Sequence, residues 1–236
     1  MNNSYYETLD ENFKQALNLY EGNYSHQQLI KFLENGNIVQ RQIAALRLET
    51  LESVQDAQIL LQNLTGQDGK IREAVSLKIN EFSSVSGLAN LFNPSLNYEI
   101  FLDAIVDINA NICRNIIGAI INFKDDTQFC SVFSSSLIKR TKNILEVVEK
   151  FDFQQGKYKV NKEVFKLYWC LEAIYEFSDK ISIDDLKEII IRAKDIQDYT
   201  IREKCAKILS KNFTDSDLVK IQIELKNDSN YYVRRY

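Results

Sequence analysis

The chain has 236 residues, of which 45% are hydrophobic and 26% charged, a mixture typical of folded proteins and too apolar for a disordered chain. The net charge of −4 argues against general nucleic-acid binding, which depends on an excess of Lys and Arg facing the phosphates. One Pro and seven Gly are too few for the many tight turns of an all-β protein, so the composition predicts a helical fold.

The first predicted helix covers residues 5–21, where apolar residues recur at steps of three and four. We expect residues 1–22 to cap one end of a single domain whose remainder, 23–236, consists of helix pairs. The residues of the first apolar stripe are Tyr6, Leu9, Phe13, Leu17 and Tyr20.

The polar opening of the chain lacks the charged-then-apolar order of a signal peptide, and no apolar run approaches the roughly 18 residues needed to cross a bilayer.

Further stripes of helical period follow along the chain, separated by short polar breaks at 34–37, 65–69, 93–95 and 214–217. These breaks supply Asn, Asp, Ser, Thr and Gly, which cap and end helices. No alternation typical of strands appears between them. The stripes include Leu29-Ile30-Leu33, Ile43-Leu46-Leu48, Ile59-Leu60-Leu64, Val75-Ile79-Phe82, Ile144-Val147-Val148-Phe151, Leu186-Ile189-Ile190 and Leu218-Ile221-Leu225.

One segment recurs along the chain, aligned on a basic residue. Apolar or small residues follow the basic residue by three, four and seven places, which forms one buried stripe of a helix. Four places before it stands an Asn or Asp suited to a helix start in the copies with Asn37, Asp68, Asp198 and Asn230, whereas the copy at Arg114 has Ala110 there. The basic residues are Arg41, Arg72, Arg114, Lys166 in a weaker copy, Arg202, and Arg234 in a copy that the sequence cuts short.

A helix preceded by Asp or Asn and opening Val/Ile-Arg-x-x-Ala/Val resembles the second helix of a HEAT-type repeat, and Asp228 to Arg234 is the best match. The resemblance covers residues 25–236 and implies an all-α, right-handed α-solenoid of about six stacked antiparallel helix pairs. In that family the Asp and Arg resemble rungs of a ladder between repeats. A single pair cannot bury its own apolar stripe, so pairs stack and share one core.

The repeat arginines have two interpretations. They could line a concave anion-binding surface, or they could pair with carboxylates and helix ends between repeats. A fixed position within each repeat favours the structural ladder.

The sequence contains no recognisable catalytic, cofactor or metal site. His26, the one histidine, is expected to be a solvated turn residue, and it leaves a histidine-based catalytic pair without a partner. The cysteines lack CxxC spacing, which makes a zinc site improbable and indicates buried free thiols in a reducing compartment. Neither a phosphate-binding glycine loop nor a GxSxG motif occurs. We therefore predict a cytoplasmic protein that needs no cofactor, and the lack of these motifs favours a non-catalytic protein over an enzyme without excluding an enzyme.

The segment 139–166 is net positive within an acidic chain and interrupts the repeat spacing with an insertion near 139–162. The stretch Phe151 to Val160 is expected to be a loop with exposed aromatic residues, and insertions in repeat proteins often lie on the binding face. The other interpretation is a long solvated helix followed by an ordinary loop. The candidate partner-binding residues are Lys139, Arg140, Lys157, Tyr158, Lys159 and Lys162.

Three functions compete. The first is a non-catalytic scaffold or adaptor that presents the concave face of a solenoid to a protein partner. The second is a bilin lyase or chromophore-handling chaperone, because HEAT-like repeats also resemble the enzymes that attach bilins to phycobiliproteins; the basic insertion would then hold a small-molecule ligand. The third, nucleic-acid binding as in helical-repeat alkylation-repair glycosylases, conflicts with the acidic charge. The short final copy at Val233–Tyr236 suggests a homodimer through the C-terminal end.

Overall fold

The computed structural model describes residues 10–153 and 157–236, and these residues form helices without any strand. Two short 3₁₀ helices, η1 (Ala89–Phe92) and η2 (Ser178–Lys180), accompany the α-helices. The α-helices are α2 (Glu11–Glu21), α3 (His26–Asn35), α4 (Ile38–Arg47), α5 (Val54–Gln62), α6 (Gly69–Ser83), α7 (Tyr98–Ala104), α8 (Ala110–Asn122), α9 (Thr127–Val148), α10 (Lys157–Phe177), α11 (Ile183–Ala193), α12 (Tyr199–Leu209), α13 (Ser216–Leu225) and α14 (Tyr231–Arg234).

The helices begin where polar side chains satisfy the first free backbone N–H groups. Ser25, Asn37 and Ser53 each form a capping box, in which the side chain three places later bonds back to the cap. The four Asn and Asp residues that the sequence analysis placed before the repeat basic residues are N-caps, which confirms those predictions; they are Asn37, Asp68, Asp198 and Asn230.

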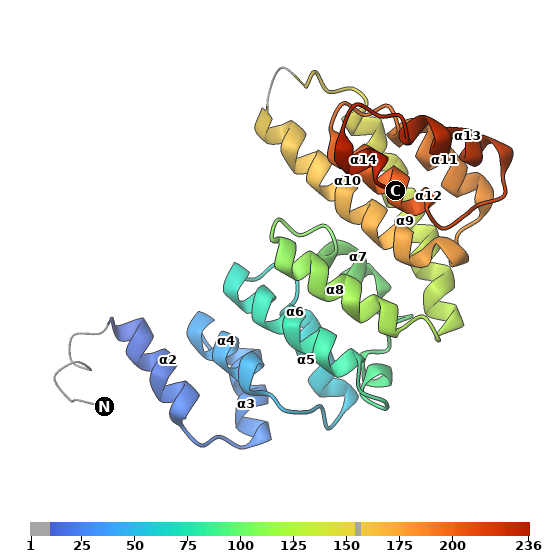
Figure 1. The fold of residues 1–236 in the computed structure, drawn as a ribbon. Helices are drawn as coiled ribbons and strands as arrows, with labels where there is room; N and C mark the ends of the chain where they lie inside the picture. The colour runs from blue at the N-terminus through green and yellow to red at the C-terminus, as the bar shows by residue number, and fades with distance from the viewer. Residues whose placement is uncertain (1–9, 154–156) are drawn as a thin grey trace.

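The helices pack in two rows (Figure 1). The even row runs α2, α4, α6, α8, α10, α12 and α14, and each of these helices contacts the next. The odd row consists of α3, α5, α7, α9, α11 and α13, with η1 joined to α5. Chain neighbours such as α3 and α4, or α9 and α10, pack as pairs, whereas α14 packs mainly on α12. An all-helical arrangement with contacts between neighbours is compatible with a helical repeat.

One hydrophobic core extends from Leu29 in α3 to Val233 in α14. Near its middle, aromatic rings from five segments pack in edge-to-face, tilted and stacked pairs, with centroids 5.1–6.3 Å apart. Trp169 is 7% exposed and packs within this core. The rings of the central cluster are Phe92, Phe101, Phe123, Phe129, Phe133 and Phe177.

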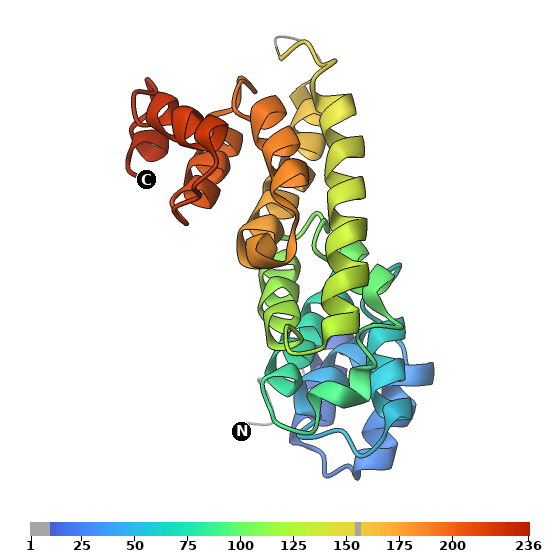
Figure 2. The ribbon, with the colours of Figure 1, turned by 90° about the vertical axis from the view of Figure 1, so that its right-hand side faces the viewer.

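The predicted insertion near 139–162 is mostly helical. Residues 139–148 form the end of α9, and α10 already begins at Lys157, so the connection is shorter than the predicted loop from Phe151 to Val160. Phe151 and Phe153 are half-buried against the core, so the expectation of exposed aromatic residues at these two positions is wrong. The long α9 and α10 link the N-terminal helices to α11–α14 (Figure 2).

The predicted first helix, 5–21, is described from residue 10 onward, where α2 begins at Glu11. Residues 1–9 lie outside the described part of the chain. Across the described residues, no helix combines the length and the apolar character that a transmembrane span requires.

Candidate interaction surface

The even-row helices share a fixed arrangement at their starts. In α4, α6, α12 and α14 an arginine stands four residues after the N-cap, and its guanidinium donates to a backbone carbonyl five or six residues earlier. Such a bond ties the helix start to the turn before it and satisfies a carbonyl oxygen there. The four arginines are Arg41, Arg72, Arg202 and Arg234.

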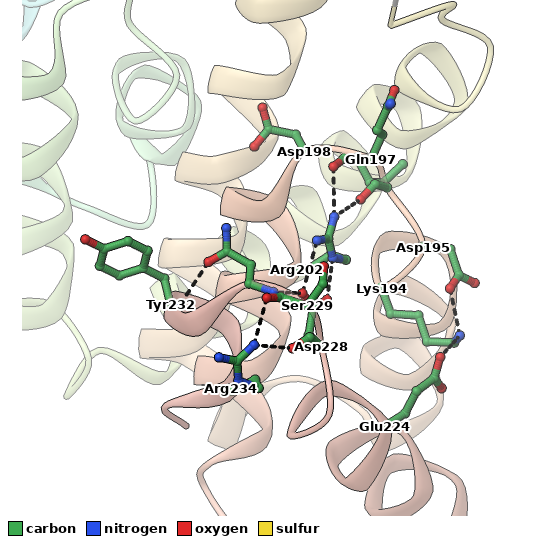
Figure 3. A network of polar contacts seen from close by, with 12 residues as sticks. Lys194, Asp195, Gln197, Asp198, Arg202, Glu224, Asp228, Ser229, Tyr232 and Arg234 are labelled. Atoms are coloured by element: carbon green, nitrogen blue, oxygen red, sulfur yellow. Dashed lines mark hydrogen bonds and ion pairs between the residues drawn. The ribbon is translucent and has the colours of Figure 1, made fainter.

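Two of these arginines also bind a carboxylate in the turn before the next even-row helix. Arg72 Nε lies 2.8 Å from Asp107 Oδ2, and Arg202 Nε lies 2.7 Å from Asp228 Oδ2, each with a second guanidinium bond to the same carboxylate (Figure 3 shows the latter pair). The Arg202 guanidinium outweighs burial and lowers the pKa of Asp228. These two arginines therefore pair with carboxylates, as the structural interpretation of the repeat arginines predicted.

Arg114 does not belong to this set, so its place in the sequence alignment is wrong. The N-cap of α8 is Asn109 rather than Ala110, and the residue four places later is Cys113. The Cys113 thiol is fully buried and donates to the Asp107 carbonyl, six residues back, in place of an arginine. Arg114 is exposed and bonds to Asn111 Oδ1 within its own helix.

Lys166 is also misplaced by the sequence alignment. It lies well inside α10 and pairs with Glu163 of the same helix at 2.7 Å, so it does not open a repeat helix.

Between α6 and α8 the even row carries an amide seam, which we define as Glu73, Ser76, Ser83, Asn109, Asn111, Asn115 and Asn122. Glu73 accepts from Asn109 Nδ2 at 3.0 Å and from Asn111 Nδ2 at 2.7 Å. Asn115 donates to Ser76 Oγ, and Asn122 to Ser83 Oγ. Gly118 lies opposite Asn80, and a Cβ on this glycine would come within 2.5 Å of Asn80 Oδ1. Two neutral hydrogen bonds, two amide bonds to the Glu73 carboxylate and one close approach therefore hold these two helices together.

Between α10 and α12 the corresponding contact is a lysine seam, which we define as Tyr168, Glu172, Tyr175, Lys204, Lys207 and Lys211. Glu172 binds Lys204 Nζ at 2.5 Å and Lys207 Nζ at 2.7 Å. The lysines also lie 4.2 Å from the ring centroids of Tyr168 and Tyr175, close enough for cation–π attraction.

The ionisation of the lysine seam is shifted by its neighbours. Burial opposes the charge of Glu172, but hydrogen bonds from both lysines outweigh it and lower the pKa. Burial likewise opposes the charge of Lys204, and the bond to Glu172 raises its pKa. For Lys211, burial prevails and lowers the pKa, assisted by the charges of Lys124 and Lys207. The seam therefore holds paired charges in a partly dry environment.

A hollow of about 410 Å³ lies on the solvent side of α4, α6 and α8. Leu46 and Leu77, both 38% exposed, form its apolar part. Polar and charged groups from three consecutive even-row helices surround them. The full lining is Gln42, Leu46, Lys70, Glu73, Ala74, Leu77, Asn111 and Asn115.

The predicted partner-binding residues are distributed over two other hollows. Lys139 and Arg140 line one of about 430 Å³ beside α7, where Arg140 bonds to the Leu102 carbonyl and pairs with Asp103. Lys162 lines another of about 250 Å³ beside Ile108. The side chains of the other three residues, Lys157, Tyr158 and Lys159, lie outside the described part of the structure. The structure thus separates Lys139 and Arg140 from Lys162.

His26 is not the solvated turn residue that the sequence predicted. Its Nε2 lies 2.9 Å from Asp56 Oδ2, and its side chain is 18% exposed. Asp56 also accepts backbone N–H bonds from Glu52 and Ser53, so it ties the start of α3 to the start of α5. Burial opposes ionisation of Asp56, yet the bond to His26 and these backbone bonds lower its pKa. Because the partners are 30 residues apart, no local sequence signal could have revealed this contact.

Among the described residues, no cluster of His, Cys, Asp and Glu has the geometry of a metal site. The cysteines are free and buried, as predicted. Burial raises the pKa of Cys113, Cys170 and Cys205 to about 12, so these thiols are not nucleophiles near neutral pH.

Comparisons with known proteins add little to this description. No family model matches the chain, and no curated protein matches it. Among solved structures, the chain is similar to the crystal structure of an engineered protein from the Northeast Structural Genomics Consortium, at 13% identity and a TM-score of 0.47, over 90% of this chain and 93% of that one. Similarity at this level carries no argument about fold or function.

Proposed function

We propose that this chain is a non-catalytic scaffold that binds a protein partner on the solvent side of its even row. The observation that carries the proposal is the hollow across α4, α6 and α8, where exposed Leu46 and Leu77 lie among amide and charged groups. Apolar anchors within a polar rim are typical of protein-binding surfaces. Asn115 adds an amide beside this hollow, a group able to donate to and accept from a bound peptide backbone.

The finer architecture belongs to the same proposal. We infer a right-handed, HEAT-like α-solenoid of six pairs in which α2 caps one end and the even row lines the concave face. This architecture is supported by the way α4, α12 and α14 begin. In each helix an arginine four residues after the N-cap donates to a backbone carbonyl five residues before the arginine. Free buried thiols support a reducing, cytoplasmic location.

The test is a pull-down from native cell extract with the full chain and two matched variants, read by mass spectrometry. Leu77→Asp places a charge in the even-row hollow, and Ile191→Asp places one on α11 of the odd row, where Ile191 is 44% exposed. We expect one stoichiometric protein that Leu77→Asp loses and Ile191→Asp retains. Equal retention by both variants, or the absence of any protein partner, would contradict the proposal. A coloured eluate with no protein partner would favour the alternative function in chromophore handling.

A further inference from the structure

The even row has a gap in its packing between α8 and α10, where the contact is much less extensive than between α6 and α8 or between α10 and α12. The turn before α8 lies against the first half of α10 here and forms the hollow of about 250 Å³. Val106 and Ile108 of the turn and Phe165 of α10 form apolar walls, and Lys162 and Lys166 stand beside them. The hollow is therefore apolar inside and positively charged at its edge.

Ile108 is the residue that breaks the pattern of the repeat. It stands directly before the N-cap of α8, and the corresponding residues of α4, α6, α12 and α14 are Gly36, Gln67, Gln197 and Ser229. An apolar residue at this position often packs down onto the first turn of the helix. Ile108 instead remains 75% exposed, so its side chain contributes little to the fold.

The charge at the edge is partly uncompensated. Lys166 is neutralised by Glu163 at 2.7 Å, whereas Lys162 is exposed and forms no ion pair with any described residue. In a chain of net charge −4, such a site favours a ligand that carries negative charge.

The size of the hollow limits its occupant. Pockets for drug-sized ligands and cofactors enclose about 300–1,000 Å³, so 250 Å³ is too small to enclose a pigment and suits one or two side chains. A partner residue that fills such a pocket, bordered by a complementary charge, is the usual form of an interface hot spot.

We propose that the hollow between the α8 turn and α10 binds a peptide segment of a protein partner through one bulky apolar side chain followed by carboxylates. The apolar side chain contacts Val106, Ile108 and Phe165, and the carboxylates face Lys162. This inference rests on the proposed scaffold function, but it concerns a different surface from the Leu46–Leu77 hollow.

Trp169 provides a direct readout, because it is the one tryptophan of the chain and its ring lies 6.1 Å from that of Phe165, nearly perpendicular to it. The full chain is titrated with short synthetic peptides that combine a central Leu, Phe or Ala with two following Asp, Lys or Ser residues, and Trp169 emission is recorded. We expect saturable binding for Leu or Phe followed by Asp, and at least tenfold weaker binding when Ala replaces the anchor or Lys replaces Asp.

Two variants supply the matched controls. Ile108→Gln installs the residue found at the equivalent places before α6 and α12, so the melting temperature should not change while the affinity falls about tenfold. Lys162→Glu should reverse the preference, so that the peptide with Lys after the anchor binds best.

Four outcomes would overturn the proposal. The first is the absence of a saturable change in Trp169 emission up to millimolar peptide, and the second is an affinity that does not depend on the charge of the peptide. The third is wild-type affinity in both variants. The fourth is a saturable response to biliverdin when no peptide gives one. A change of sedimentation coefficient in Ile108→Gln would also overturn it, because a second copy of the chain would then be the occupant. The scaffold function fails separately: an empty pull-down with the wild-type chain refutes the scaffold, whereas the absence of a saturable response to every peptide refutes only the hollow beside α10.

Discussion

The amide seam and the lysine seam hold consecutive even-row helices together by different chemistry. In the amide seam, amide and hydroxyl side chains, the single carboxylate of Glu73 and the close approach of Gly118 to Asn80 join α6 to α8. In the lysine seam, Glu172 and two tyrosine rings compensate three ammonium groups between α10 and α12.

The comparison shows that the same arrangement of neighbouring helices can be held together by different kinds of side-chain contact. Neutral hydrogen bonds need little space and respond weakly to salt and pH. Buried charges depend on every partner remaining in place, because removing one partner leaves the other charge buried and uncompensated. The two halves of the even row should therefore respond differently to the same perturbation.

The largest expected effect is the loss of the shared carboxylate. Glu172→Gln leaves the ammonium of Lys204, whose side chain is 8% exposed, without a counter-charge, which costs about 3 kcal/mol in the free energy of unfolding. Urea denaturation measures the cost. The double variant Glu172→Leu with Lys204→Met should recover most of the loss, and a single variant as stable as the wild type would show that the lysine seam contributes no net stability.

The arginine ladder should produce the next largest effect. Arg72→Ala removes a doubly bonded partner from Asp107 and is expected to cost about 2 kcal/mol, whereas Arg114→Ala on the neighbouring helix should cost less than about 0.5 kcal/mol. Thermal unfolding of both variants measures the difference. Similar losses would mean that Arg114, and not Cys113, holds the repeat position in α8.

A smaller effect is expected in the amide seam. Gly118→Ala should destabilise the chain by about 1 kcal/mol, because Asn80 must move from its position 2.5 Å from the new Cβ. Adding Asn80→Ala removes the clash. The alanine at position 118 then contributes its higher helix propensity, worth about 1 kcal/mol relative to Gly, so the double variant should be more stable than Gly118→Ala alone. Additive effects in this double-mutant cycle would show that the two residues do not contact each other.

The smallest effect concerns pH. The folded-state pKa of Glu172 is lowered, so its stabilisation is fully present above the ordinary glutamate value of 4.5 and disappears as pH falls through the lowered value. The difference in unfolding free energy between wild type and Glu172→Gln should therefore shrink at pH 3. The corresponding difference for Asn115→Ala in the amide seam should stay constant over the same range, and a parallel decrease there would remove the contrast between the seams.

The sequence reveals what is local and periodic. Asn37, Asp68, Asp198 and Asn230 were identifiable as caps because a polar side chain before an apolar stripe satisfies backbone N–H groups within its own turn. The shift by one residue in α8 arose because Arg114 lies beside the true repeat position. Asn109, four residues before Cys113, was the available signal.

Contacts between distant segments were beyond sequence reasoning. The spacing of Lys204, Lys207 and Lys211 shows that they share a helix face, but it does not show that Glu172 lies opposite. The bond between His26 and Asp56 likewise depends on how α3 and α5 pack. Of the predicted basic surface, Lys157, Tyr158 and Lys159 were expected in a loop, whereas α10 begins at Lys157. The division of the others between two hollows is a property of the packing.

The contacts of Asp228 limit where residues can be inserted into this chain. Its carboxylate accepts from Arg202 and from the N–H of Asn230, and its carbonyl accepts from Arg234, so one residue fixes the turn and joins two helices. An added residue in 226–230 would break these bonds together. Insertions, whether acquired in evolution or introduced as affinity tags, should therefore be excluded from the turn at Asp228.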